Sequence, residues 1–322
     1  MPSVANVLID ASQFPENVRR DLLRSLRERR VNHKFHYDSV KQTQKWLALH
    51  QRYSPSRYDA DCRRIYERAF KAVADEIKSR NVHVIGLGCG GGQKDTRLLK
   101  LLKARGREVF YTPCDVSTAM VLTARKTALA VLPEARCFPF VCDLATTGNW
   151  RQILVTRHSS LVTFFGMIPN FEPQEILPKL ASLIRRKDTL LFGANLAPGL
   201  DYDGGLRRIL PQYDNELTRD WLTTFLRDLG IEQPDGELGF EIESGGFGLK
   251  RVVARFRFRR KSRIQIEGAT FVFKTGEMMR LFFSYRYTPG RLRAVLARYG
   301  LNVREQWIMK SGEEGVFLIH RL

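Results

Sequence analysis

The chain has 322 residues, 43% of them hydrophobic and 27% charged, which is enough for one large domain or two ordinary domains with a sizeable core. Its apolar runs all fall well short of the roughly 18 residues that a membrane span needs. Because the amino-terminal residues also lack a basic stretch followed by an apolar core, we expect neither a membrane protein nor a secreted one.

The positive charge is the unusual bulk property of the chain. Lys and Arg number 53 against 34 Asp and Glu, a formal net charge of +19, and such an excess raises nucleic-acid binding as a hypothesis. The basic residues are, however, spread along the chain in pairs and triplets such as 185–187 and 259–261, without a basic tail or a recognised nucleic-acid motif. We therefore expect a solvated basic surface, with a nucleic acid as the alternative partner.

The cysteines bear on the cellular compartment. They are five, an odd number, and they are scattered without C-x-x-C spacing: Cys62, Cys89, Cys114, Cys137 and Cys142. This pattern predicts reduced thiols in the cytoplasm and no metal site.

The amino-terminal part of the chain is helical in pattern and rich in Arg. Apolar residues recur at helical spacing over 14–30, 40–53 and 58–77. Two short aromatic and polar segments separate these stretches, and they contain Tyr37 and Tyr53. Each tyrosine either faces a cleft or packs between helices.

A glycine-rich turn follows, in the stretch VHVIGLGCGGGQKDTR at 82–97. A buried strand here ends in Gly88, Gly90 and Gly92, and a helix begins after them. Glycines at such a turn allow positive φ and a close approach of the backbone to a ligand, while the helix offers unpaired N–H groups. The turn by itself is a weak signal, since a tight connection without any ligand has the same pattern.

Apolar strands then alternate with helices up to residue 194, at 108–115, 137–143, 160–166 and 188–194. This alternation predicts a doubly wound, mostly parallel α/β sheet of the Rossmann-like kind. Asp115, Asp143 and Asn170 follow successive strands, so they are expected at the same edge as the glycine turn, where such sheets bind ligands. Acidic groups placed for ribose hydroxyls and an adenine amine suit S-adenosylmethionine. A dinucleotide is the competitor, although the full G-x-G-x-x-G pattern is missing.

The alternation fails after Pro198. We expect a helical stretch over 206–231, a loop over 233–248, a half-exposed antiparallel strand over 251–259 and a strand over 264–274. The chain closes with a segment at 276–289, a helix at 290–300 and two strands at 302–309 and 314–322. We predict a methyltransferase domain made of 58–199 plus 286–322, and a mixed α+β substrate domain made of 1–57 plus 200–285.

Several motifs of the chain, in this order and spacing, resemble those of one family. The resemblance is to the S-adenosylmethionine-dependent histidine Nα-methyltransferases of ergothioneine synthesis, a group that includes fungal dimethylallyltryptophan N-methyltransferases of secondary metabolism. It covers nearly the whole chain and implies a class I methyltransferase fold with a second domain. The motifs are FHYD, RYSPSR, GLGCGGGQKDTR, CDVS, FFGMIPN, RILPQYD and GEMMRLFFSYRYTP.

The resemblance implies roles for the residues at the cofactor end. Gly88, Gly90, Lys94, Asp115 and Asp143 would hold S-adenosylmethionine. Among them, Lys94 would pair with the methionyl carboxylate and Asp115 with the ribose. Gly86 is a departure, because most methyltransferases have an acidic residue at that position.

The resemblance also implies an amino-acid site. Asn170 and Tyr213 would bind the carboxylate of the acceptor, while Tyr37 and Gly166 would lie near its amine. Tyr37 and Tyr53 are the candidates that orient this amine for attack. The full set of acceptor-site positions is Tyr37, Tyr53, Gly166, Asn170, Tyr213, Phe282 and Ser284.

Phe282 is the departure that bears on the acceptor, because it stands where the family has a Glu that binds the imidazole of histidine. A pocket without that carboxylate cannot pair the imidazole N–H. We therefore predict N-methylation of an aromatic or apolar amino acid, or of an amine derived from one, rather than of histidine. The other interpretation is that Phe282 is a core residue and the pocket lies elsewhere.

Two other kinds of function stay open from the sequence. A nucleic-acid methyltransferase would account for the charge of +19, and a non-catalytic relative would account for Gly86 and Phe282. The sequence does not predict the oligomeric state.

Overall fold

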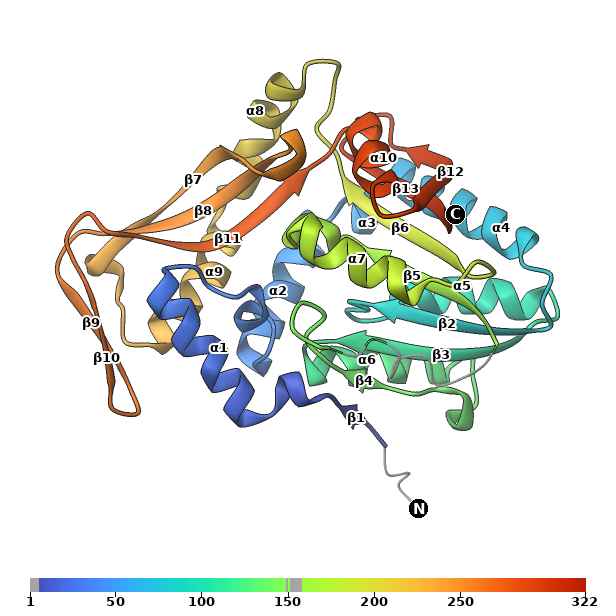
Figure 1. Cartoon of the computed structure of the whole chain (residues 1–322), viewed down its shortest axis with the longest axis horizontal. Coiled ribbons are helices and arrows are strands. Elements are labelled where there is room, and N and C mark those ends of the chain that lie inside the picture. The colour runs from blue at the N-terminus through green and yellow to red at the C-terminus, as the bar shows by residue number, and fades with distance from the viewer. Residues whose placement is uncertain (1–5, 149, 151–157) are drawn as a thin grey trace.

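The computed structural model describes residues 6–148, 150 and 158–322. Within them, a large sheet flanked by helices adjoins a smaller sheet that packs on helices from both the amino-terminal part and the middle of the chain (Figure 1). No helix of the described residues is long and apolar enough to cross a membrane.

The large sheet has eight strands in the order β1-β4-β3-β2-β5-β6-β13-β12. The six strands from β1 to β6 run parallel, while β13 and β12 pair antiparallel at the far edge. The predicted Rossmann-like sheet with an antiparallel ending is therefore confirmed. Its strands are β1 (Leu8–Ile9), β2 (Asn81–Leu87), β3 (Glu108–Asp115), β4 (Phe140–Val141), β5 (Ser159–Phe165), β6 (Thr189–Asn195), β12 (Leu301–Ile308) and β13 (Glu314–Arg321).

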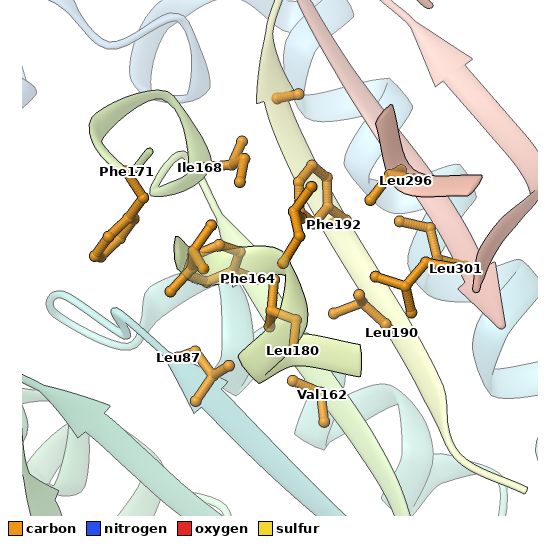
Figure 2. Packing of buried hydrophobic residues seen from close by; sticks show 14 of the residues in the cluster. Leu87, Val162, Phe164, Ile168, Phe171, Leu180, Leu190, Phe192, Leu296 and Leu301 are labelled. Carbon is orange, nitrogen blue, oxygen red and sulfur yellow. The ribbon is translucent and has the colours of Figure 1, made fainter. Parts of the chain in front are cut away.

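Helices cover both faces of this sheet. On one face, Leu180 of α7 (Pro173–Leu183) and Leu296 of α10 (Pro289–Ala297) pack with Phe164 and Phe192 of the sheet (Figure 2). On the other face, α4 (Ala60–Glu76) and α5 (Gln93–Ala104) bury an equally apolar layer. Since both faces are covered, the strands carry continuous apolar runs, as parallel strands do. Helix α6 (Thr118–Leu129) follows β3 and begins at Ser117, whose hydroxyl accepts the N–H of Met120.

The smaller sheet is antiparallel, in the order β11-β8-β7. Its strands are β7 (Gly236–Ser244), β8 (Lys250–Phe258) and β11 (Met278–Arg286), and a separate hairpin of β9 (Ser262–Ile266) and β10 (Ala269–Phe273) projects beyond it (Figure 1). Leu26, Trp221, Phe225 and Phe258 belong to the core that this sheet shares with its helices. These helices include α1 (Pro15–Glu28), α2 (Val40–Tyr53) and α9 (Glu216–Asp228). The division into the two domains proposed from the sequence stays a prediction.

The middle of the chain differs from expectation in three places. The stretch 233–248 is largely strand β7 rather than a loop, because Glu241 and Glu243 form ion pairs with Arg255 of β8. The stretch 206–231 is helical as expected, but it consists of two helices, α8 (Tyr202–Tyr213) and α9, because the side chain of Asn215 accepts the N–H of Thr218 and starts the second one. The strand expected over 264–274 is the β9–β10 hairpin, which turns at 267–268.

Two smaller differences lie near the amino terminus and the third strand. The strand expected over 137–143 has only two paired residues in β4, and a short strand β1 that was not expected pairs with it. Residues 55–58, in the segment between two of the expected helical stretches, form a short helix of their own, α3 (Pro55–Tyr58).

Candidate active site

One cavity of about 730 Å³ lies beyond the carboxyl ends of the parallel strands, a volume typical of sites for small molecules and cofactors. It is the place where doubly wound sheets bind ligands. Every site residue predicted from the sequence lines it: Gly88, Gly90, Lys94, Asp115 and Asp143 at one end, and Tyr37, Tyr53, Gly166, Asn170, Tyr213, Phe282 and Ser284 toward the other.

The glycine turn has the conformation that its sequence predicts. Gly88 and Gly90 have φ of +61° and +52°, in the left-handed region that glycine tolerates best. A Cβ on Gly88 would lie 2.4 Å from Cγ of Met167, so the turn also needs the missing side chain for space. The backbone N–H of Gly90 donates to Oδ2 of Asp115 over 3.0 Å, which fixes the turn to the end of β3.

Asp115 lies at the end of β3. Its Oδ1 accepts the backbone N–H of Ser117 over 3.0 Å, and burial raises the pKa of its carboxyl group. It forms no ion pair with any residue that the structure describes. An acceptor in this position is suited to hydroxyl donors of a ligand.

Asp143 is almost completely buried, at 1% exposure. Its carboxylate accepts the backbone N–H of Ala145 over 2.9 Å and the hydroxyl of Thr146 over 3.0 Å. Its own backbone N–H donates to the hydroxyl of Ser12, and Nζ of Lys34 lies 3.7 Å from its Oδ2. The amino-terminal segment thus supports this end of the cavity, which the sequence did not indicate.

Lys94 lies in the first turn of α5. Its Nζ is 4.0 Å from the centre of the Tyr66 ring and 3.8 Å from Oε1 of Glu314, and a quarter of the side chain is exposed. The neighbouring Asp95 points its carboxylate to Tyr111 and Thr163 and also lines the cavity. Sequence reasoning did not predict Asp95, because an acidic residue in the first turn of a helix is ordinary.

Aromatic rings enclose the other end of the cavity. Tyr37 contacts Trp46 and Trp221 with ring centres 5.9 and 5.4 Å apart, and Phe282 contacts Trp221 at 5.7 Å. Burial raises the pKa of the Tyr37 hydroxyl, so this group stays protonated over the neutral range. Tyr53, the last residue of α2, is 44% exposed and lies at the rim. Both tryptophans were missed because each is contributed by a helix whose spacing indicates only a buried face.

Polar groups line this aromatic end on the side of β11. Nδ2 of Asn170 donates to the carbonyl of Phe283 over 2.7 Å, which ties the segment after β5 to β11. The Tyr213 hydroxyl donates to Oγ of Ser284 over 2.8 Å and accepts from Nη2 of Arg286 over 2.9 Å. Arg286 is 8% exposed and has no ion-pair partner among the described residues. A buried guanidinium beside a phenol is an anion-binding arrangement. Arg286 lies within the motif GEMMRLFFSYRYTP but was not among the predicted site residues.

The family of the chain is shown by a match over most of its length. The model of the SAM-dependent histidine-specific methyltransferases matches residues 18–217 and 247–321. The chain belongs to this family. It is therefore a methyltransferase that uses S-adenosylmethionine.

The chain is also similar to individual proteins. The chain is 26% identical over 283 residues to the histidine N-alpha-methyltransferase of Mycobacterium tuberculosis, covering 83% of this chain and 82% of that protein. It is 23% identical over 252 residues to the N-methyltransferase imqF of Aspergillus flavus, covering 74% and 67%. Among solved structures, the CcbJ methyltransferase of Streptomyces caelestis is 15% identical, with a TM-score of 0.41, over 80% of this chain and 89% of that one.

The residues of the cavity fit S-adenosylmethionine. The cofactor has an adenosine part with hydroxyl and amine donors, and a methionine part with a carboxylate, an ammonium and a sulfonium. The carboxylates of Asp115 and Asp143 can accept from the first part, and the cation of Lys94 suits the carboxylate of the second. The glycine turn gives room beside them, where Trp46 of α2 lies 3.7 Å from the position of a Cβ on Gly90.

Proposed function

We propose that this methyltransferase transfers a methyl group to the amine of an aromatic or apolar amino acid, or of a small molecule derived from one. The observation that carries the proposal is Phe282, which lines the cavity beside Trp221 and Tyr213. The pocket around this ring is aromatic, so a planar apolar side chain is the group that it suits. The relatives, a histidine N-alpha-methyltransferase and fungal N-methyltransferases, support an amine as the acceptor.

The proposed cofactor site uses the edge of the sheet. Asp115 accepts hydrogen bonds from the ribose, Asp143 lies at the adenine, Lys94 pairs with the methionyl carboxylate, and Gly88 and Gly90 give the close approach. S-Adenosylmethionine supplies an electrophilic methyl group on a sulfonium. The contribution of the protein is to align the acceptor nitrogen with this methyl and to exclude water from the cationic centre.

The proposed acceptor site uses the polar side of the aromatic end. Asn170 and Tyr213 bind the acceptor carboxylate, and Ser284 contacts its side chain. Tyr37, Gly166 and Tyr53 lie near the amine. An amine must lose its proton before it attacks, and an ordinary amine does so in a useful fraction without a strong base. Tyr37 and Tyr53 then orient the free amine as hydrogen-bonding groups.

The choice between aromatic acceptors and histidine can be measured directly. Labelled methyl transfer to L-tryptophan or L-phenylalanine should exceed transfer to L-histidine by about 10²-fold in kcat/KM, because Phe282 offers no partner to the imidazole N–H. Phe282→Glu should raise the rate on histidine and lower it on the aromatic acceptors. Phe282→Leu, which stays apolar, should still reject histidine. If histidine is the best acceptor of the unchanged protein, the proposed acceptor class is wrong.

Arg286 is expected to select acceptors that carry a carboxylate. In Arg286→Met, kcat/KM for L-tryptophan should fall by about 10- to 100-fold, the effect of losing a charged hydrogen-bond donor. The value for tryptamine, which has no carboxylate, should change by less than about threefold. Arg286→Lys keeps the charge and should retain most of the preference for tryptophan. Equal losses on tryptophan and tryptamine would show that Arg286 only supports the fold around Tyr213.

A further inference from the structure

The space in front of Gly86, on strand β2, is filled by a side chain from helix α5. A Cβ built on Gly86 would lie 2.2 Å from Oδ2 of Asp95 and 3.2 Å from the hydroxyl of Tyr111. The φ of Gly86 is outside the left-handed region, so the backbone conformation does not require glycine. The glycine is required because the carboxylate of Asp95 occupies the place of a side chain at this position.

Asp95 is a buried carboxylate that forms no ion pair within the described part of the chain, although the charge of Lys94 acts on it and favours its ionised form. It is 2% exposed, its Oδ2 accepts the Tyr111 hydroxyl over 2.7 Å and its Oδ1 accepts the Thr163 hydroxyl over 2.8 Å. No described residue forms an ion pair with it. Burial is the main cause that raises the pKa of its carboxyl group. A carboxylate in such a place is costly unless a cation approaches it, and the open side of Asp95 is the cavity that it lines.

The positions of the other charged groups indicate which cationic group of the cofactor could approach Asp95. Asp115 and Asp143 follow β3 and β4, on the side proposed for the ribose and the adenine. Lys94 and Asp95 are adjacent in the first turn of α5, and both line the cavity. A cation and an anion that line the same cavity match the zwitterion of an amino acid, whose carboxylate and ammonium are bonded to one carbon.

We propose that Asp95 binds the α-ammonium group of the methionine part of S-adenosylmethionine, while Lys94 pairs with its carboxylate. The inference rests on the cofactor placement given above as part of the proposed function. Gly86 and Asp95 then act together: the missing side chain of Gly86 leaves space beside β2, and the carboxylate of Asp95 on α5 occupies that space. The contact that an acidic residue at position 86 would make is supplied from α5.

Calorimetry with two probes tests this role without any methyl transfer. S-Adenosylmethionine carries the ammonium, whereas 5′-methylthioadenosine has the same adenosine and sulfur but no amino-acid part. Asp95→Asn should weaken S-adenosylmethionine binding by about 10- to 100-fold, as expected for a lost charged hydrogen bond. Binding of 5′-methylthioadenosine should change by less than about threefold. Equal weakening of both probes, or no weakening of either, would overturn the proposal.

A second experiment places the carboxylate on strand β2 at position 86 instead of on α5 at position 95. Asp95→Ala removes the side chain that a residue at position 86 would hit, so Gly86→Asp combined with Asp95→Ala should bind S-adenosylmethionine at least about 10-fold more tightly than Asp95→Ala alone. Gly86→Asp alone should lower the melting temperature of the cofactor-free protein, because two carboxylates would then compete for one space. A double variant no better than Asp95→Ala contradicts the inference. Absence of S-adenosylmethionine binding by the unchanged protein would instead contradict the proposed cofactor site itself.

Discussion

Asn170→Ala is expected to lower kcat/KM for the acceptor by about 10²- to 10³-fold, while the Kd for S-adenosylmethionine changes by less than about twofold. The amide of Asn170 is the proposed ligand of the acceptor carboxylate. It also ties the segment after β5 to the carbonyl of Phe283 on β11 over 2.7 Å. Its loss removes one binding group and loosens the strand that carries Phe282 and Ser284, and a misplacement of about 1 Å is enough for losses of this size.

Steady-state kinetics and calorimetry on the same preparation check this expectation. Asn302→Ala is the matched control, because Asn302 is exposed on β12, and its kinetics should not change. Asn170→Asp should be about as poor as Asn170→Ala with carboxylate-bearing acceptors, since a second carboxylate repels the first. Parallel losses of turnover and of cofactor affinity in Asn170→Ala would place this residue at the wrong end of the cavity.

The cofactor end was accessible from the sequence for a topological reason. In a parallel sheet, the residue after each strand lies at the same edge, so Asp115 and Asp143 could be grouped with Gly88 although they are far apart in the chain. The apolar runs of the buried strands located those ends to within a residue or two, except at β4, which is short. Only the order of the strands had to be right.

The acceptor end was less accessible because no such rule applies to it. Tyr37, Tyr213 and Ser284 were predicted for the acceptor from the resemblance, and they line the cavity. Trp46, Trp221 and Arg286 also line it but were not predicted. Their roles depend on how α2 and α9 pack across β11, and helical spacing gives the buried face of a helix but not its neighbour. The misreading of β7 has the same origin, since its glutamates are explained only by the arginines of β8 that pair with them.

Asp95 illustrates a third kind of limit. Its place in the first turn of a helix is an ordinary one for an acidic residue, because the helix dipole favours negative charge there. Only the distance of 2.2 Å between its carboxylate and a Cβ on Gly86 connects the two positions. A compensation between a strand and the next helix is thus a property of the packing rather than of either motif.

The second large effect is expected at Lys34. This residue directly precedes the motif FHYD and was not among the predicted site residues. Lys34 lies in a short 3-10 helix (His33–His36), is fully buried and donates to Oδ2 of Asp21 on α1 over 2.6 Å. Its Nζ also lies 3.7 Å from Oδ2 of Asp143. These two carboxylates are 3% and 1% exposed, so one buried ammonium lies between two buried negative charges, one on α1 and one just after β4. The largely exposed Arg20 also lies near Asp21, with its Nε 3.7 Å from Oδ1.

Lys34→Met should therefore lower the free energy of unfolding by about 3–5 kcal/mol, because it removes the buried cation that both carboxylates share. Urea unfolding of the cofactor-free protein measures this loss.

Lys45→Met is the matched control: its partner Asp220 is 38% exposed and Lys45 itself 27%, so the loss should stay below about 1 kcal/mol. Asp21→Asn in the Lys34→Met background should restore part of the stability, since it removes one of the two unbalanced charges. If the two lysine variants lose the same free energy, the buried network does not stabilise the fold. If Lys34→Met alone is unstable and Asp21→Asn relieves it, the buried ammonium couples the stability of α1 to the end of the cavity that Asp143 lines.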